Sequence, residues 1–526
     1  MLPPGRIPDP VVLERMARAI GHRGPDAHGV EVVGSTGLAH ARLSIVDPTP
    51  AGAQPMADPD RRWWLTFNGE IFNHMELRER LGERPWRGHS DTETLLYALR
   101  DWGEAGIPRC NGLYAYAALD HERGRLLLVR DRFGVKPLYI ARHDGGIWFA
   151  SEMRALLAAG LPARPRPETL AQSVVHGWAN GRLSPLEGID RVLPGTLVEI
   201  DLESLRTAER TWYDPAAAVD PERAAALAGQ GREAHADALE DELRSSVRRR
   251  LMADVPVGTM CSGGLDSSLV TAFARDEQPG VVAFNASVAD QPEVDEGPWA
   301  ERAAEGLGVE LRTVPMTAAT WRRDLVEVVR HHEYPLIHES SVPMSQIAAL
   351  AREGGVKVLL SGEGADELFG GYGYLHHAEY RSYLRAERRA GTVARLAAMR
   401  LRRIGPGGAA RQLAEAWAAF GRRRRGLPPL TGPASKPPGY PGAGASPEAA
   451  AYEIAWRERA LAAYAHHPDH RRRLEAGLLA DLGTYLPHLL NRQDKNTMQR
   501  SIETRVPFLD PGVVSLALNL PLEARV

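Results

Sequence analysis

The chain has 526 residues, of which 44% are hydrophobic and 25% are charged, and its formal net charge is -3. These values are typical of a globular protein with several domains, and they give no reason to expect nucleic acid or a membrane surface as the main partner. The two cysteines, Cys110 and Cys261, are too few for a disulfide framework, and no apolar run approaches the ~18 residues that cross a bilayer. We therefore expect a cytoplasmic protein.

Residues 1–213 are predicted to form a first domain in which short strands mix with helices. Helical spacing covers residues 13–20 and 92–102, and strand-like runs cover residues 37–46, 63–67, 113–119 and 125–129. Strands of this kind with packed helices between them indicate a sandwich of two sheets.

Four fragments of this domain are more specific than its composition. They read Arg42-Leu-Ser-Ile-Val-Asp47, Asn68-Gly-Glu-Ile-Phe-Asn-His74, Ser90-Asp-Thr-Glu93 and Arg130-Asp-Arg-Phe-Gly-Val-Lys-Pro-Leu-Tyr139. One of them alone would be weak, because Asn-Gly is also a common turn signal. In this order, however, they resemble the glutaminase domain of class II glutamine amidotransferases, above all that of the asparagine synthetases.

The resemblance implies an α+β domain, an Ntn-hydrolase-like αββα sandwich, with a glutamine pocket. Its pocket residues would be Arg42, Asn68, Gly69, Glu70 and Asp91. Their chemistry agrees, since an arginine can hold an α-carboxylate through two hydrogen bonds and the two acidic residues can accept from an α-ammonium. The asparagine side chain and the glycine N–H can form an oxyanion hole.

The resemblance also implies a nucleophile that these residues do not supply. The family uses a cysteine directly after the initiator methionine, on a first strand, whereas this chain begins Met1-Leu-Pro-Pro-Gly5. Two explanations stay open. Either a start with the first strand has been lost, which the intact pocket residues favour, or the protein takes ammonia or another amine directly and keeps the domain as a scaffold.

A linker is predicted over residues 214–235, which are rich in Ala, Pro and Gly, followed by a basic amphipathic helix over 239–251. The next segment, Val255-Pro-Val-Gly-Thr-Met-Cys-Ser-Gly-Gly-Leu-Asp-Ser-Ser268, predicts a strand, a tight loop and a helix N-terminus. Such a junction turns backbone N–H groups towards an anion and can hold a phosphate. It is neither a Walker loop nor a dinucleotide-binding Gly-x-Gly-x-x-Gly, and a plain Gly/Ser turn capped by Asp is the alternative interpretation.

Strands and helices then alternate up to a second motif. Strands are predicted over residues 280–285, 309–314 and 356–360, with helices over 299–307 and 320–332, which indicates an α/β fold with a doubly wound parallel sheet. The third strand leads into Ser361-Gly-Glu-Gly-Ala-Asp-Glu-Leu-Phe-Gly-Gly-Tyr372. Acidic residues favour helix starts, but magnesium beside ATP phosphates explains three carboxylates in five residues better.

Both motifs resemble those of the synthetase domain of the asparagine synthetases, which is of the ATP-pyrophosphatase type. The resemblance covers the chain from His22 to about Pro521 and implies a domain over residues 236–526 that binds ATP and Mg²⁺. Glu363 would be catalytic, beside the activated acyl group, and Asp266 with Asp366 would hold the metal. The implied ATP-binding residues are Met260, Ser262, Gly263, Gly264, Asp266, Ser267, Ser268, Ala286, Ser361 and Gly362.

Three stretches depart from the family pattern. Residues 333–344 match the family's acyl-binding loop only loosely, so the identity of the carboxylic acid substrate stays open. Residues 400–448 are rich in Arg, Pro and Gly, which indicates a flexible insertion. The family's C-terminal lysine segment has no counterpart before Val526, and Lys495 and Arg505 are candidate substitutes.

The sequence thus predicts an ATP-dependent amidotransferase. It would activate a carboxylate as an acyl-adenylate and transfer ammonia, from glutamine or free, to make an amide, with aspartate as the first choice of acid. The alternatives are an amide, hydroxamate or lactam synthetase of specialised metabolism, and a catalytically inactive scaffold. A homodimer is a further expectation, because two-fold association is common among the relatives.

Overall fold

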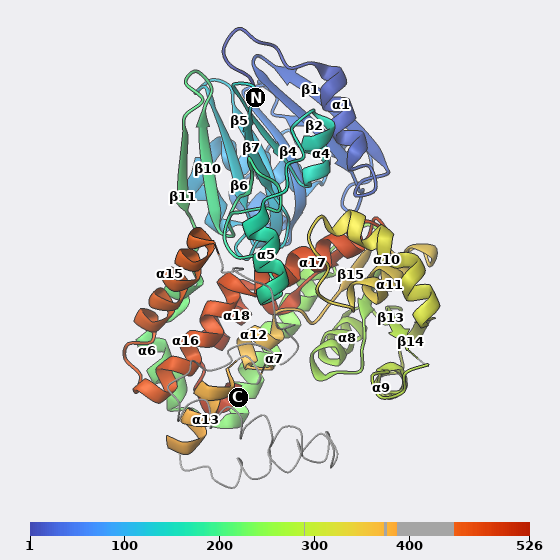
Figure 1. Ribbon diagram of the computed structural model, residues 1–526, viewed down its shortest axis with the longest axis vertical. Helices are drawn as coiled ribbons and strands as arrows, with labels where there is room; N and C mark the ends of the chain where they lie inside the picture. Colours follow the sequence, from blue (N-terminus) through green and yellow to red (C-terminus); the bar gives the residue numbers. More distant parts are fainter. Residues whose placement is uncertain (289, 373–375, 387–445) are drawn as a thin grey trace.

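The computed structural model describes residues 1–288, 290–372, 376–386 and 446–526 (Figure 1). The insertion predicted over residues 400–448 lies outside the described residues except for its last three. Of those, Ser446 caps the next helix, since its side chain accepts a hydrogen bond from the Ala449 N–H. No helix within the described ranges is both long enough and apolar enough to cross a membrane.

The N-terminal part contains two layers of antiparallel strands (Figure 1). One layer has the order β11 (Thr207–Thr211), β10 (Thr196–Asp201), β6 (Arg125–Arg130), β5 (Gly112–Asp120), β4 (Trp63–Ile71) and β3 (Met56–Ala57). The other consists of the hairpin β1 (Ala27–Val33) and β2 (Thr36–Arg42) and the set β8 (Gly146–Ala150), β7 (Tyr139–His143) and β9 (Ile189–Arg191).

Helices cover both outer faces of these layers. Helices α2 (His74–Leu81) and α3 (Asp91–Trp102) pack on the six-stranded sheet, and α1 (Pro10–Ala19) and α4 (Met153–Ala158) pack on the other layer. Side chains alternate along β5, so Tyr114 and Tyr116 face the helices while Ala115 and Ala117 face the second layer. The predicted αββα sandwich is therefore confirmed.

The C-terminal part is built on a parallel sheet of order β14 (Glu310–Pro315), β13 (Val282–Ser287), β12 (Val257–Met260), β15 (Val358–Leu360) and β16 (Glu503–Arg505). The predicted doubly wound α/β fold is confirmed. The fifth strand, β16, was not predicted, because its residues are polar or charged and yet buried, and hydrophobic patterning does not detect such a strand. The sheet's helices are α7 (Arg232–Arg250), α8 (Leu265–Glu277), α9 (Gly297–Leu307), α10 (Ala318–His332) and α11 (Ser341–Glu353).

Further helices pack beside this sheet and below the N-terminal sandwich (Figure 1). They are α5 (Pro167–His176), α6 (Pro221–Ala228), α12 (Ala365–Phe369), α13 (His377–Ala386), α15 (Pro447–Ala463), α16 (Asp469–Thr484), α17 (Leu486–Met498), α18 (Pro511–Asn519) and α19 (Leu522–Arg525). Short 3₁₀ turns are η1 (Pro50–Gly52), η2 (Gly103–Arg109), η3 (Pro215–Ala218) and η4 (Pro507–Leu509). The segment predicted as a linker thus contains η3 and α6. Helix α17 runs between the two parts of the chain and contacts both.

Candidate active site

The glycine loop lies at the carboxyl end of β12, as the sequence predicts. Gly263 has φ +77°, and a Cβ there would lie 2.2 Å from the Trp299 carbonyl carbon at the start of α9, so the close approach requires glycine. Two serines fasten the loop to the first turn of α8. Ser262 Oγ accepts from the Gly264 N–H at 3.3 Å, and Ser267 Oγ accepts from the Ser262 N–H at 3.2 Å.

The second motif packs directly on this loop. Strands β12 and β15 are parallel neighbours, with Val257 opposite Val358, so their carboxyl ends lie at one edge of the sheet. At Gly362 a Cβ would lie 3.0 Å from Asp266 Cβ and 3.2 Å from the Ser267 nitrogen. The structure therefore brings the two predicted motifs together.

Two further residues that were predicted to bind ATP lie at the same edge of the sheet. Met260 is the last residue of β12 and pairs with Phe284 of β13, and Ala286 follows near the end of β13. Both side chains are half-buried. The Ser268 hydroxyl is buried and has no hydrogen-bond partner, so a donor remains free on the first turn of α8.

The acidic residues of the two motifs influence one another. Burial and then the charge of Asp366 raise the pKa of Asp266, and burial and then Glu363 raise the pKa of Asp366. A cation between such carboxylates would relieve their repulsion. Although the described ranges contain no group of three His, Cys, Asp or Glu residues suited to hold a metal, two carboxylates completed by phosphate oxygens fit Mg²⁺.

Glu367, the third carboxylate of the second motif, differs from the other two. It is fully buried and neither side-chain oxygen has a hydrogen-bond partner. Burial, and next the charge of Glu363, raises its pKa to about 8. Burial therefore favours its protonated form, which is a poorer ligand for a metal ion than an ionised carboxylate.

Two side chains of α17 hold the second motif, and the sequence analysis missed both. Arg492 donates to Glu363 Oε1 at 2.6 Å and to Ser340 Oγ at 3.2 Å, and Gln493 Nε2 donates to Ser361 Oγ at 2.7 Å. The signal was present in the sequence as a polar run, residues 491–497, bounded by Leu490 and Met498. Every residue of that run is buried.

The predicted glutamine-pocket residues also meet. Arg42, Asn68, Gly69, Glu70 and Asp91 all line one cavity of about 480 Å³. Arg42 donates to the carbonyls of Val46, Asp47 and Thr49, which fixes its guanidinium at the cavity wall.

The two acidic residues of this cavity repel each other. Burial and the neighbouring Asp91 raise the pKa of Glu70 well above its usual value, and burial also raises the pKa of Asp91. Asp91 accepts from the Ile71 N–H at 2.8 Å, so its position is fixed. A bound ammonium would relieve this repulsion. The same cavity is lined by Met1, whose amine donates to the Ile147 carbonyl at 2.8 Å and whose pKa burial lowers to about 5.

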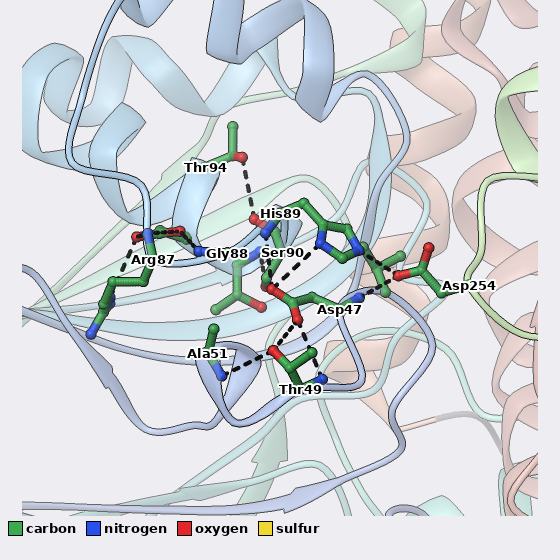
Figure 2. A network of polar contacts seen from close by, with 12 residues as sticks. Asp47, Thr49, Ala51, Arg87, Gly88, His89, Ser90, Thr94 and Asp254 are labelled. Atoms are coloured by element: carbon green, nitrogen blue, oxygen red, sulfur yellow. Dashed lines mark hydrogen bonds and ion pairs between the residues drawn. The ribbon is translucent and has the colours of Figure 1, made fainter.

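Polar contacts join the cavity wall to the C-terminal part. Figure 2 shows Asp254, three residues before β12, meeting two loops, one with Asp47 after β2 and one with His89 between α2 and α3. Asp254 Oδ2 accepts from the Asp47 N–H at 2.7 Å and lies 2.6 Å from His89 Nε2. The Asp47 side chain in turn accepts from the His89 N–H at 2.9 Å. This network ties the loop after Arg42 to the segment that leads into the glycine loop.

The two candidate substitutes for the family lysine are engaged in similar contacts. Lys495 is fully buried, pairs with Glu333 and lies over the rings of Tyr139 and Tyr334. Arg505 pairs with Glu503 at 2.9 Å and lies 3.7 Å from Glu70. Both cations therefore bridge the two parts of the chain, and these contacts direct neither of them to the glycine loop.

Comparison with known proteins agrees with this arrangement. The family model described as asparagine synthase matches residues 238–526, and that described as a glutamine amidotransferase domain matches residues 5–213. A glutamine-hydrolysing asparagine synthetase of Bacillus subtilis is 29% identical over 98% of this chain and 78% of its own length.

Two other relatives are matched over a shorter range. A glutamine-hydrolysing asparagine synthetase of Arabidopsis thaliana is 32% identical over 69% of this chain, which spans 58% of that protein. The amidase chyE of Penicillium rubens is 31% identical over 68% of this chain, which spans 55% of it. The chain belongs to the asparagine synthase family, as a ligase-type enzyme with a glutamine amidotransferase domain ahead of its synthase domain.

Proposed function

We propose that this protein activates a carboxylic acid with ATP as an acyl-adenylate and then converts it to an amide. The observation that carries the proposal is the contact between the two motifs, in which Gly362 lies against Asp266 at the mouth of the parallel sheet. Phosphate-binding N–H groups and a pair of carboxylates thereby meet in one place. These are the groups needed to bind a triphosphate and to stabilise the pyrophosphate that is released.

Each predicted residue has a role in this proposal. The phosphates bind at the glycine loop and the second motif, and the adenosine lies against Met260 and Ala286. Asp266 and Asp366 hold Mg²⁺, which when bound neutralises charge on the leaving pyrophosphate. Glu363 accepts a proton from the incoming amine, and Arg492 fixes its orientation through the 2.6 Å contact. The phosphate-binding set is Ser262, Gly263, Gly264, Ser267, Ser268, Ser361 and Gly362.

In this proposal the N-terminal part of the chain supplies the amine. We propose that residues 1–213 form the glutaminase-like domain, 214–235 the connection and 236–526 the synthetase domain. Glutamine would bind in the 480 Å³ cavity, its α-carboxylate on Arg42 and its α-ammonium between Glu70 and Asp91. Asn68 and Gly69 would hold the oxyanion. Ammonia or another amine stays the alternative, and the homodimer and the cytoplasmic location stay predictions.

The identity of the acid separates the candidates. Aspartate is the acid that the family resemblance favours, whereas the match to an amidase and the loose acyl loop favour an amide synthetase with another acid. A screen of pyrophosphate release with Mg·ATP, aspartate, other acids and several amines distinguishes them. Release with aspartate and ammonia supports asparagine formation, and release with another pair supports the alternative. If the full-length protein releases no pyrophosphate with any pair, the hypothesis of a catalytically inactive scaffold is supported.

A further inference from the structure

Strand β16 of the synthase domain reaches the wall of the proposed glutamine pocket, and the roles above use neither of its charged residues. Glu503 is only 4% exposed and lines the same 480 Å³ cavity as Glu70 and Asp91. Arg505 is fully buried, and its Nη2 lies 3.7 Å from Glu70 Oε1. Two charges from one part of the chain therefore face a binding pocket in the other part.

Arg505 is held firmly in this place. Its Nη1 donates to the carbonyls of Arg250 at 2.7 Å and Met252 at 2.6 Å, and its Nε donates to Glu503 Oε1 at 2.9 Å. The guanidinium plane also lies over the ring of Phe72, 5.3 Å from its centroid. Because these bonds use Nη1 and Nε, the Nη2 group is the one left to interact with the pocket.

Glu70 and Asp91 share one proton. Their side chains are hydrogen-bonded to each other, which two ionised carboxylates cannot do, so one of them is protonated. Burial, and then the charges of Asp91 and Glu503, raise the pKa of Glu70 well above its usual value, and this hydrogen bond acts in the same direction. Burial raises the pKa of Asp91 to about 6, but the hydrogen bond opposes that rise. Glu70 is therefore the partner that keeps the proton.

The other charged groups around Glu70 act on its proton in opposite ways. Besides burial and Asp91 of α3, the carboxylate of Glu503 raises the pKa of Glu70, whereas the guanidinium of Arg505 lowers it. Arg42, at the end of β2, is a second cation within electrostatic reach. The two β16 residues thus oppose each other at the same pocket carboxyl.

An α-ammonium that binds between Glu70 and Asp91 displaces their shared proton, because it needs both carboxylates in the ionised form. The guanidinium of Arg505 disfavours the protonated form of Glu70 and provides a counter-ion for the ionised form. The ammonium would lie on the Asp91 side of Glu70 and so farther from that guanidinium than the carboxyl itself. Arg505 therefore favours the exchange of the proton for the ammonium.

We propose that Arg505 is a positioning residue of the glutamine pocket, whose guanidinium stabilises the ionised form of Glu70 that the α-ammonium of the amine donor requires, and that Glu503 opposes it. This inference rests on the proposed function, and it adds that a strand of the synthase domain completes the pocket. Arg505 then serves the amine donor and not ATP, which separates it from the family lysine that it was a candidate to replace.

The test measures Kd of the full chain for L-glutamine by calorimetry from about pH 5 to about pH 9. Below the pKa of Glu70, Kd should rise by up to about tenfold per pH unit, because the proton competes with the ammonium. Titrations in buffers of different ionisation enthalpy should show about one proton released per glutamine in that range. The analogue 4-carbamoylbutanoate, which is glutamine without its amino group, should release none.

Two variants should move this pH profile in opposite directions. In Arg505→Met the rise in Kd should begin about one pH unit or more higher than in wild type, and in Glu503→Gln it should begin lower, because each variant removes one of the opposing charges. A purely structural role would not produce opposite shifts. Arg166→Met is the matched control, since it removes a buried arginine that pairs with Asp190 at 3.0 Å outside the cavity, and its profile should stay that of wild type.

The outcomes separate the inference from the function on which it rests. Profiles that are unchanged in both variants, or shifted in the same direction, would overturn the inference and leave the glutamine pocket intact. If wild-type protein binds no glutamine at any pH, the assigned pocket falls together with the inference. Should Arg505→Met fail to fold, Glu503→Gln decides alone, because a lower onset supports the inference and an equal or higher onset contradicts it.

Discussion

Gly362→Ala tests whether the two motifs must touch for ATP to bind. The new methyl carbon would lie 3.0 Å from Asp266 Cβ, 3.2 Å from the Ser267 nitrogen and 3.3 Å from the Asp266 carbonyl carbon. Two of these neighbours are backbone atoms in the first turn of α8, which cannot swing aside as a side-chain tip can. The motifs must therefore separate by several tenths of an ångström.

Overpacking of this kind costs about 1–3 kcal/mol. Because the strain falls on the atoms that would hold the phosphates, we expect Kd for Mg·ATP, measured by calorimetry, to rise by about tenfold or more, which corresponds to ~1.4 kcal/mol. Gly306→Ala is the matched control, since a Cβ on that helical glycine meets nothing within 4 Å. An unchanged Kd in Gly362→Ala, with a melting temperature equal to that of wild type, would refute the packing argument.

Three further predictions concern the carboxylates and the contact between the two parts of the chain. Asp366→Ala and Glu363→Ala should each abolish acid-dependent pyrophosphate release while the circular dichroism spectrum stays that of wild type, and near-normal turnover in either variant would contradict the assigned role. In the folded protein the pKa of Glu367 is raised from 4.5 to about 8. Its contribution to the free energy of unfolding is therefore fully present below about pH 4.5 and is lost as the pH rises through 8. Glu367→Gln should therefore flatten the fall in melting temperature between pH 6 and about pH 9, and an unchanged slope would count against this cause. Asp254→Ala removes the acceptor shared by Asp47 and His89 and should lower the free energy of unfolding by about 1–3 kcal/mol. In limited proteolysis, residues 251–256 should then be cleaved earlier than in wild type. An unaltered cleavage rate would show that the network in Figure 2 does not stabilise this segment.

Local patterns were sufficient for much of the fold. Residues 281–284 are all apolar, and the glycine loop is bounded by a strand and an amphipathic helix, so hydrophobic patterning located β13, β12 and α8. The four N-terminal fragments and the two C-terminal motifs also identified residues that the fold brings together.

The elements that were missed share a different physical basis. Residues Glu503–Arg505 form an edge strand of the sheet whose buried charges are satisfied by ion pairs. Helix α17 buries Arg492, Asp494 and Lys495 against partners more than a hundred positions away. Such burial becomes favourable only after a distant counter-ion is in place. The linker prediction missed α6 for another reason, because composition alone does not register the local helix start, in which Asp220 caps Pro221–Ala228.

The measurement that tests the account most directly is phosphorus-31 NMR of the products formed from Mg·ATP with a turned-over acid and ammonia. The account predicts AMP and pyrophosphate in equal amounts, formed only when the acid is present and absent with Asp366→Ala. Formation of ADP and inorganic phosphate, or of AMP at the wild-type rate in Asp366→Ala, would contradict it.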